Sequence, residues 1–360
     1  MNQMRLLRPL ISSIQNLTYC MHKIAALLIF LFYCSVSFSQ EIPKPQVLII
    51  TTGGTIASKT EAPLIEGQEL IQAVPELNQY ATIEVDEFIK LGSSKMTPSI
   101  WLQLVKHIRA ALNSNPEIKS VIITHGTDTM EETAFFLNLT HQSNVPIVLV
   151  GSMRSSNEIS ADGPANLINA VRVGISPEAI GKGVMVVMND NISAGRDLLK
   201  MNNRRVDAFP STELGFMGFC DPEKVTFYRS PIKLHTVESE FNVYDLDSLP
   251  KVDIIQDFAG LDPNILTYFT NRPNQGLVIS SFAGGRLSNG FGEIHYWPET
   301  HKPIVISSSI KGGRIMGSNS QGSPIIIAND LPSNKARILL ILSLTRTNEI
   351  NKIQGYFNKY

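Results

Sequence analysis

The sequence predicts an α/β protein with two doubly wound domains, a larger N-terminal one built on a mainly parallel sheet and a smaller C-terminal one. Short runs rich in Val and Ile alternate with longer segments of helical periodicity. These runs are continuously apolar, as is typical of parallel strands buried on both faces. The composition, 43% hydrophobic and 18% charged over 360 residues, suits one or two globular domains and excludes a disordered or collagenous chain.

The N-terminal domain is expected to begin with alternating strands and helices. Thr97 followed by Pro98 predicts the start of a helix, because proline suits the first helical position. Asp162 before Pro164 predicts a second start of the same kind, with Asp162 as the cap. After Asn189 the pattern loosens into a long irregular segment in which we expect short hairpins. The predicted strands are residues 47–50, 83–88, 121–124, 147–150 and 184–188.

A second stretch of alternation predicts the C-terminal domain. We place the N-terminal catalytic domain at residues 40–240, a polar linker at 241–251 and the C-terminal α/β domain at 252–360. The predicted C-terminal strands are 252–255, 276–280, 304–307 and 325–328, with helices near 264–270, 335–344 and 349–357.

Residues 1–39 have the composition of a secretory signal peptide. A basic start at His22 and Lys23 precedes an apolar run, and small residues then lead to Ser39 before Gln40. Met21 is a plausible true start, which would make residues 1–20 an extension from a mis-called start codon. The alternative is a retained N-terminal anchor, but the apolar run is short for a membrane span. The sequence therefore predicts a periplasmic or secreted protein.

Removal of this segment changes the charge and the cysteine count. It holds Arg5, Arg8 and Lys23 and no acid, so 28 bases would face 32 acids, a net charge of about −4. Nothing in this balance favours nucleic acid as a partner. Only Cys220 would remain of the three cysteines, so the mature chain would lack an internal disulfide.

Two strand ends carry hydroxyls and glycine where chemistry is expected. VLIITTGGTIAS (47–58) places Thr55 after two glycines, and VIITHGTDTMEET (121–133) places Thr127 and Asp128 after a similar strand. Thr129 and Glu132 match a capping box, which predicts a helix beginning just after Asp128. In open α/β sheets, ligands bind at the carboxyl ends of the strands, and a helix N-terminus there favours negative charge. The two turns are therefore expected to face one crevice.

The residue types of these turns exclude several classes of binding and catalytic site. The glycines match neither a Walker loop nor a dinucleotide fingerprint, and the chain has no His-Glu-x-x-His motif, no paired cysteines and no Gly-x-Ser-x-Gly elbow. A threonine nucleophile remains, and threonine needs an adjacent base. The alternative interpretation is structural, with Thr55 and Thr127 capping helices. The residues alone leave both interpretations open.

The segments TTGGTIAS, HGTDTMEET and GSMR…SADGPANL resemble the two signatures and the central core of exported, type II bacterial L-asparaginases. The likeness covers nearly the whole chain from Val47 onwards. It implies hydrolysis of the side-chain amide of L-asparagine, with glutaminase-asparaginase activity on L-glutamine as the near alternative. It also implies a reaction without metal or cofactor, and a homotetramer built as a dimer of dimers.

The resemblance also implies roles for particular residues. Thr55 would be the nucleophile, with Thr127, Asp128 and Lys200 (in GRDLLK) as its catalytic partners. A lysine partly desolvated between polar neighbours can serve as base or proton relay. Asp128 would also bind the substrate's α-ammonium and Ser93 its α-carboxylate, with Ser94 beside them, where many family members have glutamine.

Other matches to the family are read as structural. We interpret Arg154 as pairing within the core of the site. His125 is interpreted as a buried, satisfied histidine rather than a catalyst.

Two departures from the family pattern concern activation of the nucleophile. The stretch SKTEAPLIEGQELIQ (58–72) is a short lid without the usual tyrosine. The segment SSSIKGGRIMGSNSQGSPIII (307–327) lacks the glutamate that a neighbouring subunit normally contributes. These departures raise the alternative of a catalytically impaired amino-acid-binding homologue.

Overall fold

The computed structural model describes residues 16–28, 43–54, 56, 67–210, 212–262, 264–291, 302–317 and 325–360. The chain separates into one unit at 1–44 and a second at 45–360. Residues 16–28 of the first unit are helical. Within the described residues, no helix combines the length and apolar character needed to cross a membrane. Most of the predicted signal peptide, its cleavage site included, lies outside the described residues.

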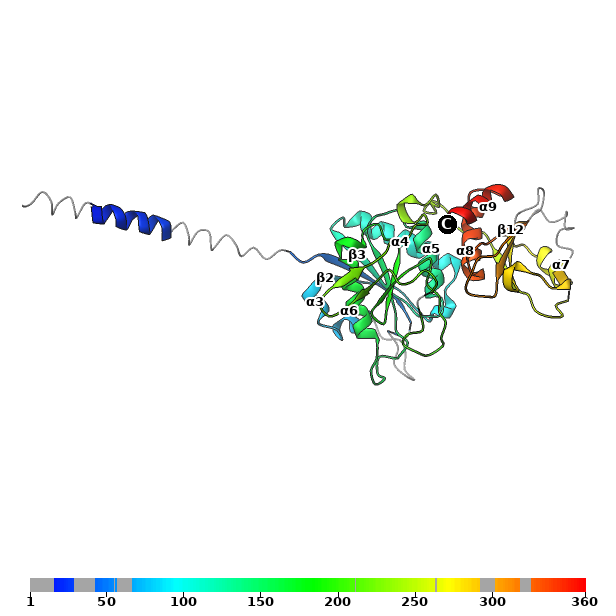
Figure 1. Cartoon of the computed structure of the whole chain (residues 1–360), viewed down its shortest axis with the longest axis horizontal. Helices are drawn as coiled ribbons and strands as arrows, with labels where there is room; N and C mark the ends of the chain where they lie inside the picture. The colour runs from blue at the N-terminus through cyan, green and yellow to red at the C-terminus, as the bar shows by residue number, and fades with distance from the viewer. Residues whose placement is uncertain are drawn as a thin grey trace, which may run out of the picture. The chain divides into compact units, whose positions relative to one another are not determined.

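A large sheet, called sheet A here, organises the first part of the second unit (Figure 1). Its strand order is β2-β1-β3-β4-β5-β6-β7-β8. The pairs among the first five strands are parallel and those from β5 to β8 are antiparallel. The strands are β1 Gln46–Gly53, β2 Thr82–Leu91, β3 Ile118–Thr124, β4 Ile147–Val150, β5 Met185–Met188, β6 Asn191–Ala194, β7 Gly218–Cys220 and β8 Val225–Phe227.

Helices cover both faces of sheet A, which explains the continuously apolar strands. Leu48 and Ile50 of β1 pack in one core cluster with α4 and α5, while Val47 and Ile49 point to the other face and pack in a second cluster with α2, α3 and α6. Successive side chains of a strand point to opposite faces, so a strand covered on both sides must be apolar throughout. The helices are α2 Gly67–Gln72, α3 Leu77–Tyr80, α4 Pro98–Ser114, α5 Met130–Thr140 and α6 Gly163–Gly174.

The predicted helix starts are found, but neither of the two predicted side-chain caps, at Thr129 and Asp162, is present. Helix α4 begins at Pro98 as predicted, and Thr97 Oγ1 accepts a hydrogen bond from Ile100 N (3.3 Å). The capping box at Thr129 is wrong, because its Oγ1 instead donates to Ser93 O (2.8 Å). The cap by Asp162 is also wrong, because its carboxylate accepts from the backbone N–H groups of Met153 and Arg154.

A second sheet, called sheet B here, follows in the C-terminal part. Its order is β12-β11-β10-β9, and all its pairs are parallel. The strands are β9 Val252–Gln256, β10 Gly276–Ser281, β11 Ile304–Ser308 and β12 Ile325–Ile327, and the helices are α7 Asn264–Thr270, α8 Ser333–Leu344 and α9 Ile350–Lys359. Short 3-10 helices are η2 Ser93–Lys95, η3 Pro177–Ala179, η4 Thr236–Glu238, η5 Ala283–Gly285 and η6 Asn289–Phe291. The predicted α/β class with a large and a small sheet is confirmed.

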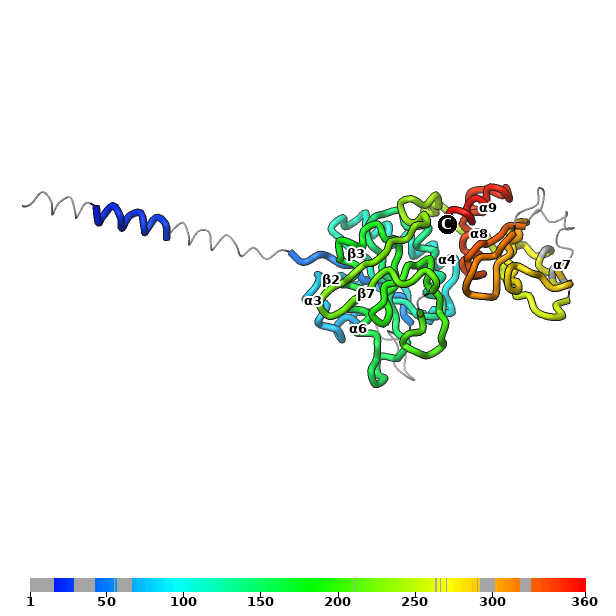
Figure 2. Tube along the Cα trace, in the orientation of Figure 1, coloured from blue at the N-terminus to red at the C-terminus, as the bar shows by residue number. Residues whose placement is uncertain are grey.

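Helix α8 joins the two sheets. It contacts α5 on one side and β9, β10 and β11 on the other, so one apolar cluster runs from sheet A to sheet B. The chain trace shows the segment that ends in α9 returning to this junction (Figure 2). The predicted linker 241–251 begins there with Phe241, which is fully buried against Tyr356 and Tyr360. The boundaries predicted at 240 and 252 stay a prediction.

Candidate active site

The strand order of sheet A reverses at β1. From β1 the chain goes first to β2 on one side and then crosses to β3 on the other. Such a reversal separates the loops that follow β1 and β3, and it opens a crevice at the carboxyl ends of these strands. Both threonine-bearing turns follow these two strands. Their predicted common location is therefore a consequence of the topology.

The backbones of the two turns are in close contact. Thr52 Oγ1 donates to Thr124 O (2.8 Å), which ties the end of β1 to the end of β3. Gly54 has φ of 86°, and a Cβ there would lie 2.3 Å from Gly126 N. Only glycine fits this backbone conformation at this distance. The glycines thus allow the turn that precedes Thr55 to approach the turn that carries Thr127; Thr55 itself lies outside the described residues.

The third strand end places Ser93 beside the β3 turn. Ser93 begins η2, just after β2, and only 5% of it is exposed. Its Oγ accepts a hydrogen bond from Asp128 N (3.1 Å). A hydroxyl that accepts this bond can still donate its own proton to a ligand carboxylate. The neighbouring Ser94 is exposed.

The side chain of Lys200, in the segment after β6, contacts Thr127 and Asp128 of the turn after β3. Its Nζ donates to Thr127 Oγ1 (2.8 Å) and to Asp128 Oδ1 (3.0 Å). The Lys200 side chain is 18% exposed and that of Asp128 is 63% exposed, so the lysine lies deeper than the carboxylate. Thr127 is buried. A threonine hydroxyl, a carboxylate and an ammonium group are therefore connected just beyond the carboxyl end of β3.

Glu131 anchors the backbone of Lys200. Its Oε2 accepts from Lys200 N (2.8 Å), and its Oε1 accepts from Asn334 Nδ2 (2.6 Å). Glu131 is buried in the first turn of α5. The sequence shows Glu131 only as an acidic residue just inside the start of a helix, and such a residue cannot be told from an ordinary helix-start acid by pattern alone.

His125 is held neutral beneath the turn. Its Nδ1 donates to Gly126 O (2.7 Å), and Thr133 Oγ1, which accepts from Trp101 Nε1, donates to its Nε2 (2.9 Å). Full burial lowers the pKa of His125 to about 4, because the charged imidazolium would be desolvated. This agrees with the structural interpretation of His125 rather than with a catalytic one.

Other predicted features fall outside this group of contacts. Arg154 Nη1 donates to Ser160 O (2.7 Å) in a surface loop, so the prediction that it pairs within the core of the site is wrong. Residues 58–66 of the predicted lid and 318–324 of the C-terminal segment lie outside the described residues. No cluster of potential metal ligands occurs among the residues that the structure describes.

Comparison with known proteins gives matches over both parts of the chain. Residues 46–233 match the family described as "Asparaginase, N-terminal", and residues 251–357 match the "Glutaminase/Asparaginase C-terminal domain". The chain is 38% identical to L-asparaginase 2 of Bacillus subtilis, over 91% of this chain and 89% of that protein. It is 37% identical to a probable periplasmic L-asparaginase of Haemophilus influenzae, over 92% and 97% of the two chains.

A solved structure extends the likeness to the fold. The crystal structure of a probable cytoplasmic L-asparaginase from Campylobacter jejuni superposes with a TM-score of 0.84 at 41% identity, covering 88% of this chain and all of that one. Sequence and fold thus agree over both sheets. The chain belongs to the asparaginase family.

Proposed function

We propose that this protein hydrolyses the side-chain amide of L-asparagine, with Thr55 as nucleophile and Lys200, Thr127 and Asp128 as its catalytic group. The observation that carries this proposal is the pair of contacts from Lys200 Nζ to Thr127 and Asp128 at the reversal point of sheet A. A half-buried ammonium beside a buried hydroxyl is suited to move a proton at a defined atom. The relatives named L-asparaginase support the substrate.

Two polar groups are suited to bind the amino-acid part of the substrate. The exposed Asp128 carboxylate presents an oxygen to the substrate's ammonium group. Ser93 Oγ, fixed by Asp128 N, can donate to the carboxylate. Ser94 lies next to Ser93 and is exposed, so we place it at the edge of this subsite. Ser93 and Asp128 are 35 residues apart in sequence but in direct contact, so they could hold the carboxylate and the ammonium group of one substrate molecule side by side.

The proposed reaction has two steps. In the first, Thr55 Oγ bonds to the amide carbon, the C–N bond breaks, and the threonine proton passes to the leaving nitrogen to give ammonia. In the second, water bonds to the same carbon, the ester C–O bond breaks, and Thr55 regains its proton as aspartate leaves. Lys200, through Thr127, would give a proton from its ammonium group to the leaving group and recover a proton from the attacking group, so that its charge is restored at the end of each step.

The test is ammonia release from L-asparagine by the mature protein and its variants. We expect Thr55→Ala and Lys200→Met each to lower kcat by about 100-fold or more, the usual scale of nucleophile and acid–base removal. Lys352→Met, an exposed lysine on α9, is the matched control and should retain the wild-type rate. No ammonia from either asparagine or glutamine, or full activity in Thr55→Ala, would refute the proposal.

A broader amide specificity is the second candidate. It is favoured by the description of the matched C-terminal family, which includes glutaminases. One methylene is typically worth only about 1–3 kcal/mol of discrimination, so a single site can accept both amides. The ratio of kcat/KM for asparagine and glutamine separates the two activities.

A binding protein without turnover is the third candidate. The absence of tyrosine from 58–66 and of glutamate from 309–324 favours it, because both would help to activate the nucleophile. Calorimetry distinguishes it from an enzyme. Tight binding of asparagine without aspartate formation would establish binding alone.

We also propose that the protein is exported and tetrameric. The pattern of residues 22–39 and the relative described as periplasmic support export, whereas the Campylobacter protein is described as cytoplasmic. N-terminal sequencing of the protein from its natural compartment tests cleavage before Gln40. Light scattering of the mature protein tests whether four chains assemble.

A further inference from the structure

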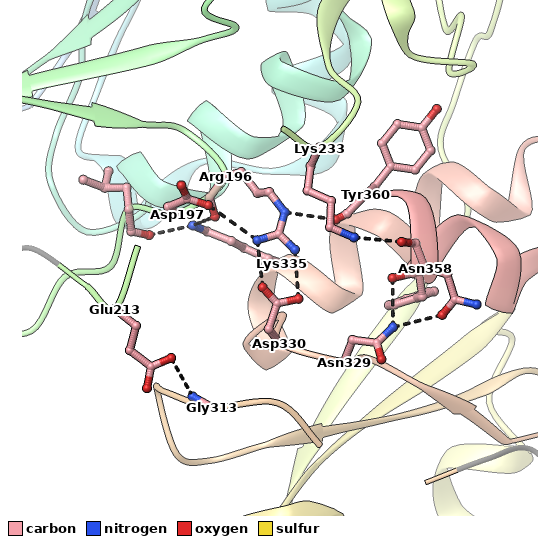
Figure 3. A network of polar contacts seen from close by, with 12 residues as sticks. Arg196, Asp197, Glu213, Lys233, Gly313, Asn329, Asp330, Lys335, Asn358 and Tyr360 are labelled. Carbon is pink, nitrogen blue, oxygen red and sulfur yellow. Dashed lines mark hydrogen bonds and ion pairs between the residues drawn. The ribbon is translucent and has the colours of Figure 1, made fainter. Parts of the chain in front are cut away.

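Lys335, in the first turn of α8, is a fully buried lysine with a complete set of acceptors. Its Nζ donates to three backbone carbonyls, Gly195 O (3.3 Å), Arg196 O (2.6 Å) and Leu198 O (2.6 Å). Figure 3 shows Lys335 reaching toward the segment that contains Arg196 and Asp197. An ammonium group has three donors, and here each has a carbonyl partner. Lysine is almost never fully buried unless it is paired, so this position requires a reason.

All three carbonyls belong to the segment that leads to Lys200. This segment leaves β6 at Ala194 and turns immediately, with Leu198 N donating to Ala194 O (3.0 Å). Its carbonyls converge on one point because the ammonium neutralises their dipoles there. Without that cation, three buried acceptors would lose their side-chain donor at once.

The far end of the segment is held by the same turn of α8. Lys200 N donates to Glu131 Oε2, and Glu131 Oε1 accepts from Asn334 Nδ2. Adjacent residues of α8 therefore fix the start of the segment directly and its end through Glu131. The side chain of Lys200 is then the part that extends to Thr127.

The charge of Lys335 fits this role. Burial lowers its pKa to about 8, while Glu131 and Asp197 nearby favour the charged form. It is therefore largely protonated at neutral pH. Arg196, inside the same segment, is braced separately by Asp330 (2.9 Å) and by Tyr360 O (3.0 Å), so the segment faces the C-terminal part along its length (Figure 3).

We propose that Lys335 is a positioning residue for Lys200: it holds the 195–198 carbonyls so that Lys200 Nζ stays within hydrogen-bond distance of Thr127. This inference rests on the proposed function, in which Lys200 moves protons. It assigns to the C-terminal part a role within the site of its own chain. Lys335 acts through Lys200 and does not touch the reacting atoms.

The test is a double-mutant cycle with Lys335→Met and Lys200→Met, measured by steady-state kinetics on full-length mature protein. We expect Lys335→Met to lower kcat by about 10- to 100-fold, since a misplacement of about 1 Å costs rates of that order. The KM for asparagine should change less than about threefold. In the Lys200→Met background, Lys335→Met should cause no further loss, because the residue that it positions is already absent.

Two controls keep the outcome interpretable. Lys352→Met should behave as wild type, and Lys335→Gln, which retains two donors, should lose less kcat than Lys335→Met. If Lys335→Met does not fold, Lys335→Gln replaces it in the double-mutant cycle, and it too should cause no further loss of kcat in the Lys200→Met background. Wild-type kcat in a folded Lys335 variant, or an equal loss with and without Lys200, would overturn the inference. Wild-type activity in Lys200→Met would instead overturn the proposed function.

Discussion

The carboxyl edges of sheets A and B are built from similar sequences and differ in what their hydroxyls do. Strand β1 ends in two threonines and glycine, and β10 and β11 end in serines followed shortly by paired glycines. In sheet B, Ser281 Oγ donates to Ser307 O (2.5 Å) and Ser307 Oγ donates to Leu331 O (2.8 Å). Both hydroxyls are buried and bind backbone. In sheet A, Thr52 does the same, but Thr127 receives a hydrogen bond from Lys200.

Two physical differences separate these edges. Sheet A reverses its strand order at β1, which opens a crevice, whereas the order of sheet B runs from β9 to β12 without reversal. Sheet A also has an ammonium group at its edge. Asp330, in the turn after β12, and Asn334, in the first turn of α8, brace the segment that carries this group, Asn334 through Glu131. A hydroxyl at a strand end is therefore a weak indication of chemistry until a base or acid is found beside it.

The largest effect should distinguish Thr127 from Ser307. We expect Thr127→Ala to lower kcat/KM for asparagine by about 1000-fold, or roughly 4 kcal/mol, because it removes the partner of Lys200 Nζ. The matched variant Ser307→Ala should remain within about twofold of wild type. Steady-state kinetics on both variants measures this. Similar activities for the two variants would show that the carboxyl edges of sheets A and B do not differ in function.

The next effect concerns the close approach of the two turns. Gly54→Ala should lower the free energy of unfolding by about 3–5 kcal/mol, because it combines positive φ with a Cβ 2.3 Å from Gly126 N. Gly284, at the edge of sheet B, has φ of 71° but no atom within 4 Å of its Cβ position. Gly284→Ala should therefore cost only about 1–2 kcal/mol. Equal losses in denaturant unfolding would show that the turns of sheet A are not tightly apposed.

A smaller loss of folding stability should appear as pH falls, and it should come from His125, which follows strand β3 of sheet A. The unfolded chain protonates histidine near pH 6.5, whereas burial lowers the pKa of His125 in the fold to about 4. The unfolded state binds more protons between these values, so stability is fully present above pH 6.5 and is lost as pH falls toward 4. At pH 5 the loss should be about 2 kcal/mol.

His125→Gln should remove this part of the pH dependence. Denaturant unfolding of wild type and variant at pH 7.5 and pH 5 measures it. His141, whose pKa burial also lowers to about 4, should keep its own contribution in that variant. An unchanged difference between the two pH values in His125→Gln would mean that His125 is protonated in the fold.

The smallest effect belongs to sheet B. Ser281→Ala should destabilise the protein by about 1–2 kcal/mol, since it leaves the buried Ser307 carbonyl without its hydroxyl donor, and it should not change kcat. Thermal unfolding together with the ammonia assay tests both statements. A fall in kcat beyond about twofold would give the sheet B edge a part in the chemistry.

Much of the fold could be predicted because it depends on local sequence patterns. Apolar runs and helical spacing locate β1 to β5, β9 to β12 and the main helices, since strands buried on both faces, such as β4 and β5, are almost entirely apolar. The capping box at Thr129 failed because Ser93, 36 residues away in sequence, competes for the same hydroxyl. Asp162 failed as a cap for the same kind of reason, because nearby loop amides bind its carboxylate.

The site was only partly accessible from sequence. Thr127 and Asp128 were indicated by their position after a strand, but Lys200 lies 72 residues from Asp128 and was assigned only through family resemblance. Glu131 and Lys335 were missed, because their roles depend on contacts that join residues 69 and about 140 positions apart. No periodicity or spacing rule reports such contacts.

The most direct test of the account is to find which hydroxyl becomes acylated. Wild-type protein would be mixed with saturating asparagine, quenched in acid within milliseconds and digested, and the peptides would be analysed by mass spectrometry. The account predicts an aspartyl ester on the peptide that contains Thr55, absent from Thr55→Ala. An ester on Thr127, or on the serines at the edge of sheet B, would contradict it.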